Sequence, residues 1–294
     1  MKPLTFHIVD VFAEEKYAGN QLAVFRNAQG LSDKKMQSIA RETNFSETTF
    51  ILSESPRDGG YDVRIFTPAA EVPFAGHPTL GTAYIISREI IGKPVEQLTL
   101  NLKIGQIPVT LGTPGEPEVL WMKQKAPDFG PTIDTGAMAD MLGLGPNQID
   151  SRFPIQEVST GLWFIIVPLT NLEAVRQARV SRDKYFAFVE QRQKAGILVF
   201  SPETYSEQND LNVRVFVPYY GIEEDPATGS GNGCLASYLV RHRYFGGSQI
   251  DIRVEQGHEI DRPSLIYHRA SEQAGQIDVN IGGKVAMIAK GNLV

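Results

Sequence analysis

Short hydrophobic segments alternate with polar turns along the first third of the chain. Four of these segments are rich in β-branched and aromatic residues and are predicted strands: 4–12, 21–25, 48–52 and 61–66. Residues 32–43 carry Met36, Ile39 and Ala40 at helical spacing after Ser32, a residue type common at helix starts. The pattern therefore predicts an amphipathic helix among the strands.

The middle of the chain continues this mixture. Pro78 suits the first position of a helix, and residues 79–91 are small and apolar, as expected of a buried helix. Further strands are predicted at 98–102, 107–111 and 119–122, with a turn at 112–117 and an irregular stretch at 126–151 that holds one short helix near 138–142. Many short strands with few, separated helices favour an α+β fold, and 294 residues suggest two domains that change near 115–130.

One segment of the chain is repeated. Arg64-Ile-Phe66-Thr-Pro68 recurs as Arg214-Val-Phe216-Val-Pro218. Each copy is followed by a loop, by a polar residue beside proline (His77-Pro78 and Asp225-Pro226), and then by a helix of small and apolar residues. Two such copies suggest two similar domains facing each other, with matching helix starts at the cleft. Chance similarity of strand–turn–helix units is the alternative.

Composition and charge limit the function. The net charge is −6, from 28 basic and 34 acidic residues, so no overall attraction to nucleic acid or to anionic lipid is expected. No run approaches the ~18 apolar residues of a membrane span, and the N-terminus lacks a signal-peptide pattern. The single cysteine, Cys234, leaves no internal disulfide. We therefore expect a cytoplasmic protein.

Glu47 and His77 are candidate catalytic residues. Glu47 precedes an apolar strand, where partial desolvation would raise its pKa and suit it to proton exchange near neutrality. His77 follows Gly76, which lets a ligand approach the backbone, and the positive end of a helix would favour its neutral form. A solvated loop glutamate and a histidine that only caps the helix are the alternatives.

Asp225 is the third candidate, because it precedes a glycine-rich stretch. Thr228, Gly229, Ser230 and Gly231 come before a helix predicted at 234–241. Their free backbone N–H groups would suit a carboxylate or phosphate. A simple Asp-Pro turn or helix cap is the alternative.

Other chemistries fit less well. A dinucleotide site is disfavoured, because the glycines do not directly follow a strand and Asp251 lies inside a predicted strand. No His-Glu-x-x-His motif, cysteine pair or carboxylate cluster indicates a metal. Cys234 is expected to be a small buried residue.

Taken together, these segments resemble the PhzF (phenazine biosynthesis) family. The motifs that carry the resemblance are Gly19-Asn20, Ser46-Glu47-Thr48, Gly76-His77-Pro78-Thr79-Leu80-Gly81, Ser159-Thr160-Gly161, Glu224-Asp225-Pro226-Ala227-Thr228-Gly229-Ser230 and Val279-Asn-Ile-Gly-Gly-Lys-Val285. They span nearly the whole chain. One departure is Gln21, where the family usually has proline after Gly-Asn, and it leaves the substrate in doubt.

The resemblance implies a fold similar to that of diaminopimelate epimerase. That fold has two pseudo-symmetric domains, each a β-sheet or barrel wrapped around a central helix, with the site between them. Its final strand often returns to the first domain, so the expected domains are 1–118 with 284–294, and 119–283. Family members are often homodimers, and a homodimer is expected here.

The resemblance also implies roles for individual residues. Glu47 matches the family's proton-transferring glutamate, and His77 and Asp225 match its assisting polar pair. Positions that line the substrate's anionic group are matched by Gly76, Gly229, Ser230 and Gly231. The same motifs add Asn20, Ser46, Pro78, Thr79 and Thr228 as expected substrate-binding residues.

The expected function is that of a cofactor-independent, metal-free isomerase. Glu47 would move a proton between carbons of a small unsaturated or enolisable carboxylic acid. An amino-acid epimerase or racemase that uses Glu47 against Asp225 is one alternative, and a non-catalytic small-acid-binding protein on the same scaffold is another. A two-thiol racemase is not expected, because Cys234 is alone.

Overall fold

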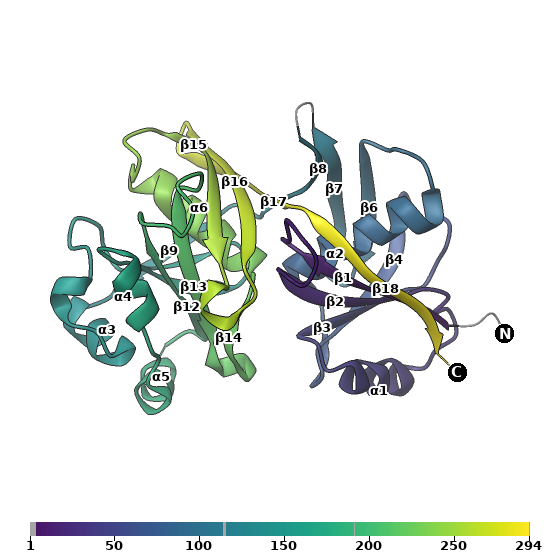
Figure 1. The fold of residues 1–294 in the computed structure, drawn as a ribbon, viewed down its shortest axis with the longest axis horizontal. Coiled ribbons are helices and arrows are strands. Elements are labelled where there is room, and N and C mark those ends of the chain that lie inside the picture. Colours follow the sequence, from purple (N-terminus) through teal and green to yellow (C-terminus); the bar gives the residue numbers. More distant parts are fainter. Residues whose placement is uncertain (1–3, 114–115, 191, 294) are drawn as a thin grey trace. The chain divides into compact units, whose positions relative to one another are not determined.

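The computed structural model describes residues 4–113, 116–190 and 192–293. The chain divides into two compact units, which we call unit 1 (Met1–Lys123 and Gly282–Val294) and unit 2 (Gln124–Ile281). Figure 1 labels their helices and strands. The domain boundaries expected from the sequence, 118/119 and 283/284, stay a prediction. Residues 114–115 of the predicted turn lie outside the described residues.

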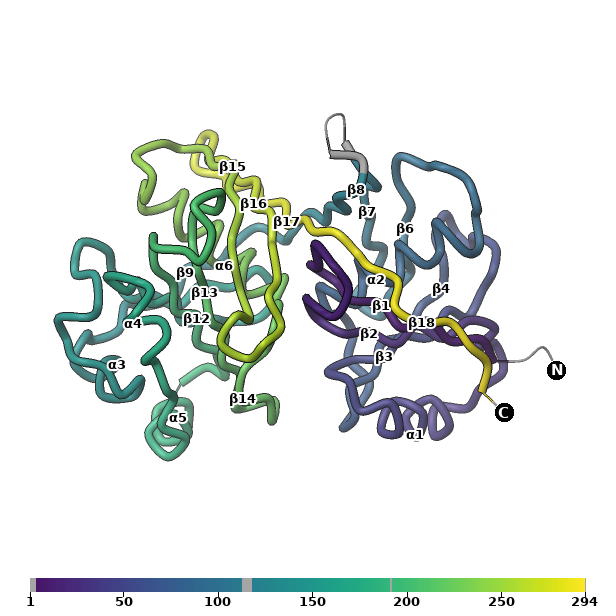
Figure 2. Tube along the Cα trace, in the orientation of Figure 1, coloured from purple at the N-terminus to yellow at the C-terminus, as the bar shows by residue number. Residues whose placement is uncertain are grey.

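Unit 1 is a sheet wrapped around the helix α2. Its strands pair in the order β18–β1–β2–β3–β4–β6–β7–β8, with β5 beside β4. Their bounds are β1 (Leu4–Val11), β2 (Asn20–Phe25), β3 (Glu47–Ile51), β4 (Tyr61–Phe66), β5 (Glu71–Val72), β6 (Gln97–Leu102), β7 (Gly105–Thr113), β8 (Glu116–Lys123) and β18 (Val285–Leu293). The last strand, β18, runs antiparallel to the first strand, β1. Figure 2 shows the two side by side, β18 in yellow and β1 in purple.

The helix α2 (Gly76–Ile85) is central to unit 1 and packs against β1, β2, β3, β6, β7, β8 and β18. A side chain at Gly81 would lie 2.6 Å from Leu22 and 2.8 Å from Val11, so glycine there allows the helix to approach β1 and β2 closely. The sequence placed Pro78 at the first helical position, and that was wrong, because the helix starts at Gly76. Proline is tolerated in this first turn, where amides have no intrahelical acceptor. A π-helix, Ile86–Ile91, continues α2.

The helix α1 (Asp33–Thr43) confirms the predicted amphipathic helix. The Ser32 hydroxyl accepts a hydrogen bond from the Lys35 amide at 3.3 Å, which caps the helix start. Its apolar face packs into a hydrophobic cluster that includes Phe25 and Phe50 from β2 and β3. The helical spacing of apolar residues therefore found the correct face.

Unit 2 repeats the architecture of unit 1. Its strands pair in the order β9–β10–β11–β12–β13–β15–β16, with β14 beside β13. Their bounds are β9 (Asp128–Thr132), β10 (Gln156–Ser159), β11 (Trp163–Pro168), β12 (Ala195–Ser201), β13 (Leu211–Val217), β14 (Ile222–Asp225), β15 (Gln249–Gln256) and β16 (Ser264–Gln273), followed by β17 (Gln276–Gly283). The central helix is α6 (Gly229–Arg241), and smaller helices are α3 (Thr135–Leu142), α4 (Leu172–Gln177) and α5 (Arg182–Val189).

The sense of strand pairing is the same in both units. From β18 to β7 in unit 1, and from β9 to β16 in unit 2, the successive pairs are antiparallel, antiparallel, parallel, antiparallel, parallel and antiparallel. The internal repeat in the sequence therefore reflects a repeated fold. The strand β9 was missed, because it lies in a stretch rich in Gly, Pro and Asp that predicted irregular structure.

The repeated Arg-x-Phe segment has the same structural role in each unit. Arg64 on β4 makes a two-pronged ion pair with Glu71 (2.8 and 2.7 Å) and lies 5.1 Å from the Phe66 ring. Arg214 on β13 pairs in the same way with Glu224 (2.9 and 2.7 Å) and lies 4.8 Å from the ring of the phenylalanine two residues later. Each arginine thereby ties its sheet to the short strand that precedes the central helix.

Candidate active site

Glu47 and His77 are in contact within unit 1. Glu47 opens β3, and His77 is the second residue of α2, which packs against that strand. His77 Nε2 lies 3.4 Å from Glu47 Oε2, and their side chains are 6% and 16% exposed. The structure thus brings together two residues that lie far apart in the sequence.

Burial disfavours the charged form of the His77 ring. Burial lowers the pKa of His77 to about 3, and a hydrogen bond to the backbone of Gln21 acts in the opposite direction. Nε2 makes no hydrogen bond to the described residues, so Nδ1 donates to the Gln21 carbonyl. The ring therefore presents an unprotonated Nε2 to Glu47. Gln21 itself lies in β2, which confirms the strand predicted at 21–25.

The other expected residues of unit 1 lie around this pair. Leu22 on β2 is paired with Glu47 on the parallel strand β3. Asn20, which opens β2, and Ser46, which immediately precedes β3, therefore lie at the same end of this strand pair as Glu47. Gly76 begins α2. The Thr79 hydroxyl donates to the Ala75 carbonyl at 2.7 Å, so its proton stabilises the helix start.

Asp225 lies at the end of β14 in unit 2 and is 8% exposed. The Thr228 hydroxyl donates a short hydrogen bond to Asp225 Oδ2. The helix α6 begins at Gly229, earlier than the predicted start at Cys234. Its first intrahelical bond runs from the Asn232 amide to the Thr228 carbonyl at 2.9 Å.

Three amides precede that first bond, those of Gly229, Ser230 and Gly231. Amides at this position have no intrahelical acceptor and carry the positive end of the helix dipole. The predicted N–H groups are therefore present, but in the first turn of the helix and not in a loop before it. Glycine also serves packing here, because a side chain at Gly233 would lie 3.0 Å from Gln124.

A buried polar chain that the sequence did not reveal lies behind Asp225. Gln256 Nε2 donates to the Asp225 carbonyl (2.7 Å) and to the Thr228 hydroxyl (3.1 Å). Its Oε1 accepts from the Thr228 amide (3.2 Å) and from Asn232 Nδ2 (2.8 Å). Asn232 Oδ1 is bonded to His268 Nε2 at 2.8 Å. Gln256, Asn232 and His268 are all completely buried.

The signal that could have revealed this chain is a polar residue on a buried face. Ile266 and Ala270 on β16 are buried, and His268 lies between them on the same face of the strand. A histidine at such a position needs a hydrogen-bonding partner. Nothing in the sequence identified that partner as Asn232.

The expected residues thus form two sets, one inside each unit. Glu47 and His77 are in contact in unit 1, and Asp225 is bonded to Thr228 at the start of α6 in unit 2. Residues 9–291 match the family of phenazine biosynthesis-like proteins, PhzC-PhzF. The chain belongs to this family.

Relatives of this PhzF-family protein are similar over their whole length. The trans-2,3-dihydro-3-hydroxyanthranilate isomerase of Pseudomonas aeruginosa is 35% identical over 287 residues, which is 97% of each chain. The crystal structure of a PhzF-family protein from Bacillus anthracis is 28% identical, with a TM-score of 0.91 over 100% of both chains. The fold is also similar to that of a hydroxyproline epimerase from Agrobacterium vitis, with a TM-score of 0.62 at 10% identity over 100% of this chain and 91% of the epimerase.

These comparisons confirm the expected family and the α+β fold of diaminopimelate epimerase type. They also confirm that this PhzF-family protein is an isomerase. Among the described residues, no helix is both long and apolar enough to cross a membrane. The expected homodimer stays a prediction.

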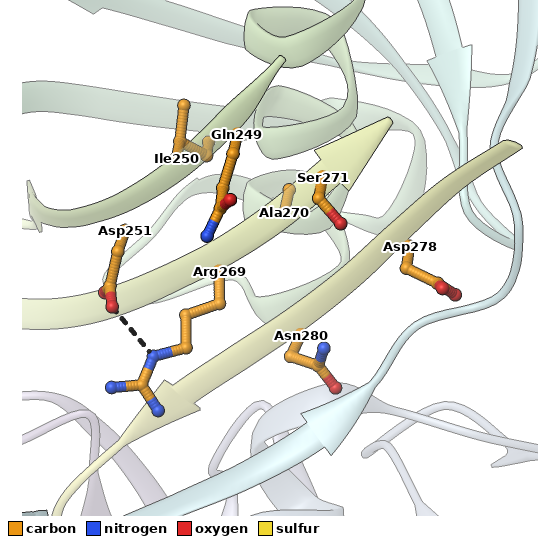
Figure 3. Close-up of a pocket in the computed structure, with 8 residues that line it drawn as sticks. All are labelled: Gln249, Ile250, Asp251, Arg269, Ala270, Ser271, Asp278 and Asn280. Carbon is orange, nitrogen blue, oxygen red and sulfur yellow. Dashed lines mark hydrogen bonds and ion pairs between the residues drawn. The ribbon is translucent and has the colours of Figure 1, made fainter. Parts of the chain in front are cut away.

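A shallow pocket of this PhzF-family protein lies elsewhere in unit 2. It is lined by residues of β15, β16 and β17, namely Gln249, Ile250, Asp251, Arg269, Ala270, Ser271, Asp278 and Asn280 (Figure 3). Arg269 Nε donates to Asp251 Oδ2 at 3.1 Å. None of the expected site residues lines it, and the Asp251 that a dinucleotide site would require is an exposed ion-pair partner here.

Proposed function

We propose that this isomerase moves a proton between two carbons of a small unsaturated or enolisable carboxylic acid, without a cofactor. Glu47 removes the proton from one carbon and returns it to another on the same face of the substrate. The 3.4 Å contact between Glu47 Oε2 and His77 Nε2 carries the proposal. It places a partly buried carboxylate, the usual general base for such a step, beside a neutral basic nitrogen.

The His77 ring favours the protonated form of Glu47 that arises during the reaction. When Glu47 is ionised, a carboxylate oxygen faces the lone pair of Nε2, and the contact is between two acceptors. After proton abstraction, the Glu47 hydroxyl becomes a donor for Nε2. The proton is therefore stabilised on Glu47 between its removal from one carbon and its transfer to the next. The electron pair of the broken C–H bond stays on the substrate.

Asp225 and the first turn of α6 are proposed to act on the same substrate. The amides of Gly229, Ser230 and Gly231 would bind its carboxylate, and Asp225 would accept a hydrogen bond from its hydroxyl or amino group. Charge that spreads into the substrate carboxylate would be stabilised by these amides. General base catalysis supplies about 10²–10⁴-fold, so this electrostatic contribution is needed as well.

The first test uses the acid after which the Pseudomonas aeruginosa relative is named, trans-2,3-dihydro-3-hydroxyanthranilate. Incubation in D₂O, followed by mass spectrometry and NMR, reports turnover and the carbon that receives the new hydrogen. We expect Glu47→Gln to lower kcat by about 10³-fold, because the amide cannot accept the proton. Exposed Glu42→Gln, on α1, is the matched control and should keep full activity.

Two results would count against this proposal. Glu47→Gln with near-normal turnover would remove Glu47 as the base. An unchanged melting temperature of the wild-type protein across a panel of small carboxylic and aromatic amino acids, together with no turnover of the first substrate, would reject a small carboxylate as the substrate class.

An epimerase would use Asp225 as a second acid or base on the opposite face. Asp225 accepts a hydrogen bond from the Thr228 hydroxyl, which stabilises its ionised form and makes it a poor proton donor. The isomerase is therefore the better-supported function. Chiral chromatography of the products distinguishes the two, because an epimerase inverts one centre and leaves the double bonds in place.

A further inference from the structure

The hydrogen bonds behind Asp225 can run in only one direction. An ionised carboxylate only accepts, so the Thr228 hydroxyl donates to Asp225 Oδ2. The same hydroxyl must then accept from Gln256 Nε2, which fixes the orientation of the Gln256 amide. Its Oε1 consequently faces Thr228 N and Asn232 Nδ2, and Asn232 Oδ1 is left to accept from His268.

His268 closes the chain as a donor. Its Nε2 must carry a proton, since Asn232 Oδ1 can only accept. The other ring nitrogen, Nδ1, has no hydrogen-bonding partner in the part of the chain that the structure describes. An unpaired lone pair in an apolar interior costs less than an unpaired charged N–H, and burial accordingly lowers the pKa of His268 to about 3.

We propose that Gln256, Asn232 and His268 are positioning residues that hold Asp225 and the first turn of α6 in place, with His268 supplying the donor that closes the chain. The role of Asp225 on the substrate rests on the proposed function. The positioning itself rests on the bonds just described, which start at a fully buried ring on β16 and end at the carboxylate.

Thr228 is the residue through which this chain acts. Its amide donates to Gln256, its carbonyl accepts from Asn232 Nδ2 (3.0 Å) and its hydroxyl is bonded on both sides. Every polar group of Thr228 is thus fixed by a buried partner. Because Thr228 immediately precedes α6, its orientation determines where the first amides of the helix point and which way the Asp225 carboxylate faces.

Without the His268 donor the chain loses the bond that closes it. Asn232 Oδ1 would be buried without a partner, and rotation of the Asn232 amide would turn this acceptor oxygen toward Gln256 Oε1, which now accepts from Asn232 Nδ2. Gln256 would have to follow, and the Thr228 amide would lose its acceptor. Since one misplaced group about 1 Å from its productive position can cost 10²-fold in rate, a distant histidine can affect turnover in this way.

The first measurement needs no substrate. Long-range ¹H–¹⁵N spectra of the histidine rings, with His268 assigned from its absence in His268→Gln, report which ring nitrogen carries the proton. We expect the Nε2–H tautomer of His268 throughout pH 5–9. An Nδ1–H tautomer, or titration in this range, would overturn the direction of the chain.

The second measurement compares three variants. His268→Leu removes the donor, His268→Gln restores an amide donor, and Tyr238→Phe is a control that removes one buried hydrogen bond elsewhere on α6, from the Tyr238 hydroxyl to the Pro154 carbonyl. Hydrogen exchange of the Thr228 amide should be about tenfold faster in His268→Leu, should recover in His268→Gln, and should be unchanged in Tyr238→Phe.

The third measurement is turnover of the isomerisation substrate. In His268→Leu, kcat should fall roughly 10- to 100-fold with little change in KM, whereas Tyr238→Phe should lose thermal stability but keep its kcat. Wild-type kcat and wild-type exchange of the Thr228 amide in a folded His268→Leu would overturn the positioning role. If no acid is turned over by the wild-type protein, the proposed function fails, and the tautomer and exchange results still decide the positioning.

Discussion

The two units share a strand order and a central helix, yet the polar residues at the start of that helix have different hydrogen-bonding partners in each unit. In unit 1, the His77 ring is bonded to a backbone group of Gln21 and faces Glu47 at 3.4 Å. In unit 2, Asp225 lies at the end of a hydrogen-bonded chain that passes through Thr228, Gln256, Asn232 and His268. The first arrangement offers an acceptor to a proton on its carboxylate, and the second donates to its carboxylate and favours the ionised state.

This difference suits two separate tasks. A group that gains and loses a proton must be stable in both forms, and rigid bonding to one form would raise the barrier to the other. A group that orients a ligand benefits from being fixed beforehand, because less freedom is lost on binding. The same fold can therefore supply a proton-transfer group in one unit and a binding group in the other, because the hydrogen-bonding partners at the start of the central helix differ.

The largest expected effect concerns the two-pronged ion pairs, Arg214 with Glu224 in unit 2 and Arg64 with Glu71 in unit 1. Arg214 and Glu224 have side chains only 4% and 9% exposed, and Arg214 Nη1 also donates to buried carbonyls of Val175 and Ala178 (2.9 Å each). Arg214→Met should lower the free energy of unfolding by about 3–5 kcal/mol, because it leaves Glu224 buried without its partner. Urea denaturation followed by circular dichroism measures this loss.

The matched variant in unit 1 is Arg64→Met. Arg64 is 20% exposed, and Lys103 Nζ still donates to Glu71 at 2.6 Å when the arginine is gone. The expected loss is therefore smaller, about 1–2 kcal/mol. Equal losses of unfolding free energy in the two variants would show that the two ion pairs contribute equally and that the deeper burial of Arg214 does not matter.

A medium effect is expected at acid pH from two buried histidines, His77 in unit 1 and His268 in unit 2. Burial holds the pKa of His77 and of His268 at about 3, against about 6.5 in an unfolded chain. Below pH 6.5 the unfolded state binds a proton that the folded state does not, so stability falls as the pH drops toward 3. The slope is at most about 1.4 kcal/mol per pH unit for each histidine.

Replacing each histidine by glutamine separates the two contributions. His77→Gln and His268→Gln should each flatten the pH dependence of the free energy of unfolding between pH 6.5 and 4, and neither should change its slope between pH 7 and 9. A wild-type slope in His77→Gln alone would mean that Glu47 holds the ring protonated, and the two units would then differ in this respect as well.

The smallest effect is expected at the pocket of Figure 3. Asp251 and Arg269 are 60% and 35% exposed, and ion pairs at such positions contribute little. Asp251→Asn should change the free energy of unfolding by less than about 0.5 kcal/mol and leave turnover unchanged. A loss of activity in this variant would move the functional site away from Glu47, His77 and Asp225.

Sequence patterns predicted local elements and the repeat, because these depend on short-range spacing. The cap at Ser32, the apolar face of α1 and the recurrence of Arg-x-Phe could all be found by reading neighbouring residues. The start of α6 was placed too late, because glycines that suggest a loop are also tolerated in a helix that packs closely against Gln124 and Thr160.

The supporting residues of the candidate site could not be predicted in the same way. Gln256 and His268 approach Asn232 from two strands, β15 and β16, and their distances depend on how those strands pack against α6. The backbone contact between Gln21 and His77 likewise depends on tertiary packing. Residue type indicates that a buried polar group needs a partner, but only the fold determines which one.

The pairing of β18 with β1 affects the order in which the protein can be completed during translation. At about 5–20 residues per second, β1 leaves the ribosome roughly 15–60 s before its partner strand exists. The residues of unit 2 are contiguous, so that unit can finish folding while unit 1 still lacks its last strand. During this interval one edge of β1 is open, and a chaperone or a neighbouring nascent chain would find its unpaired backbone there.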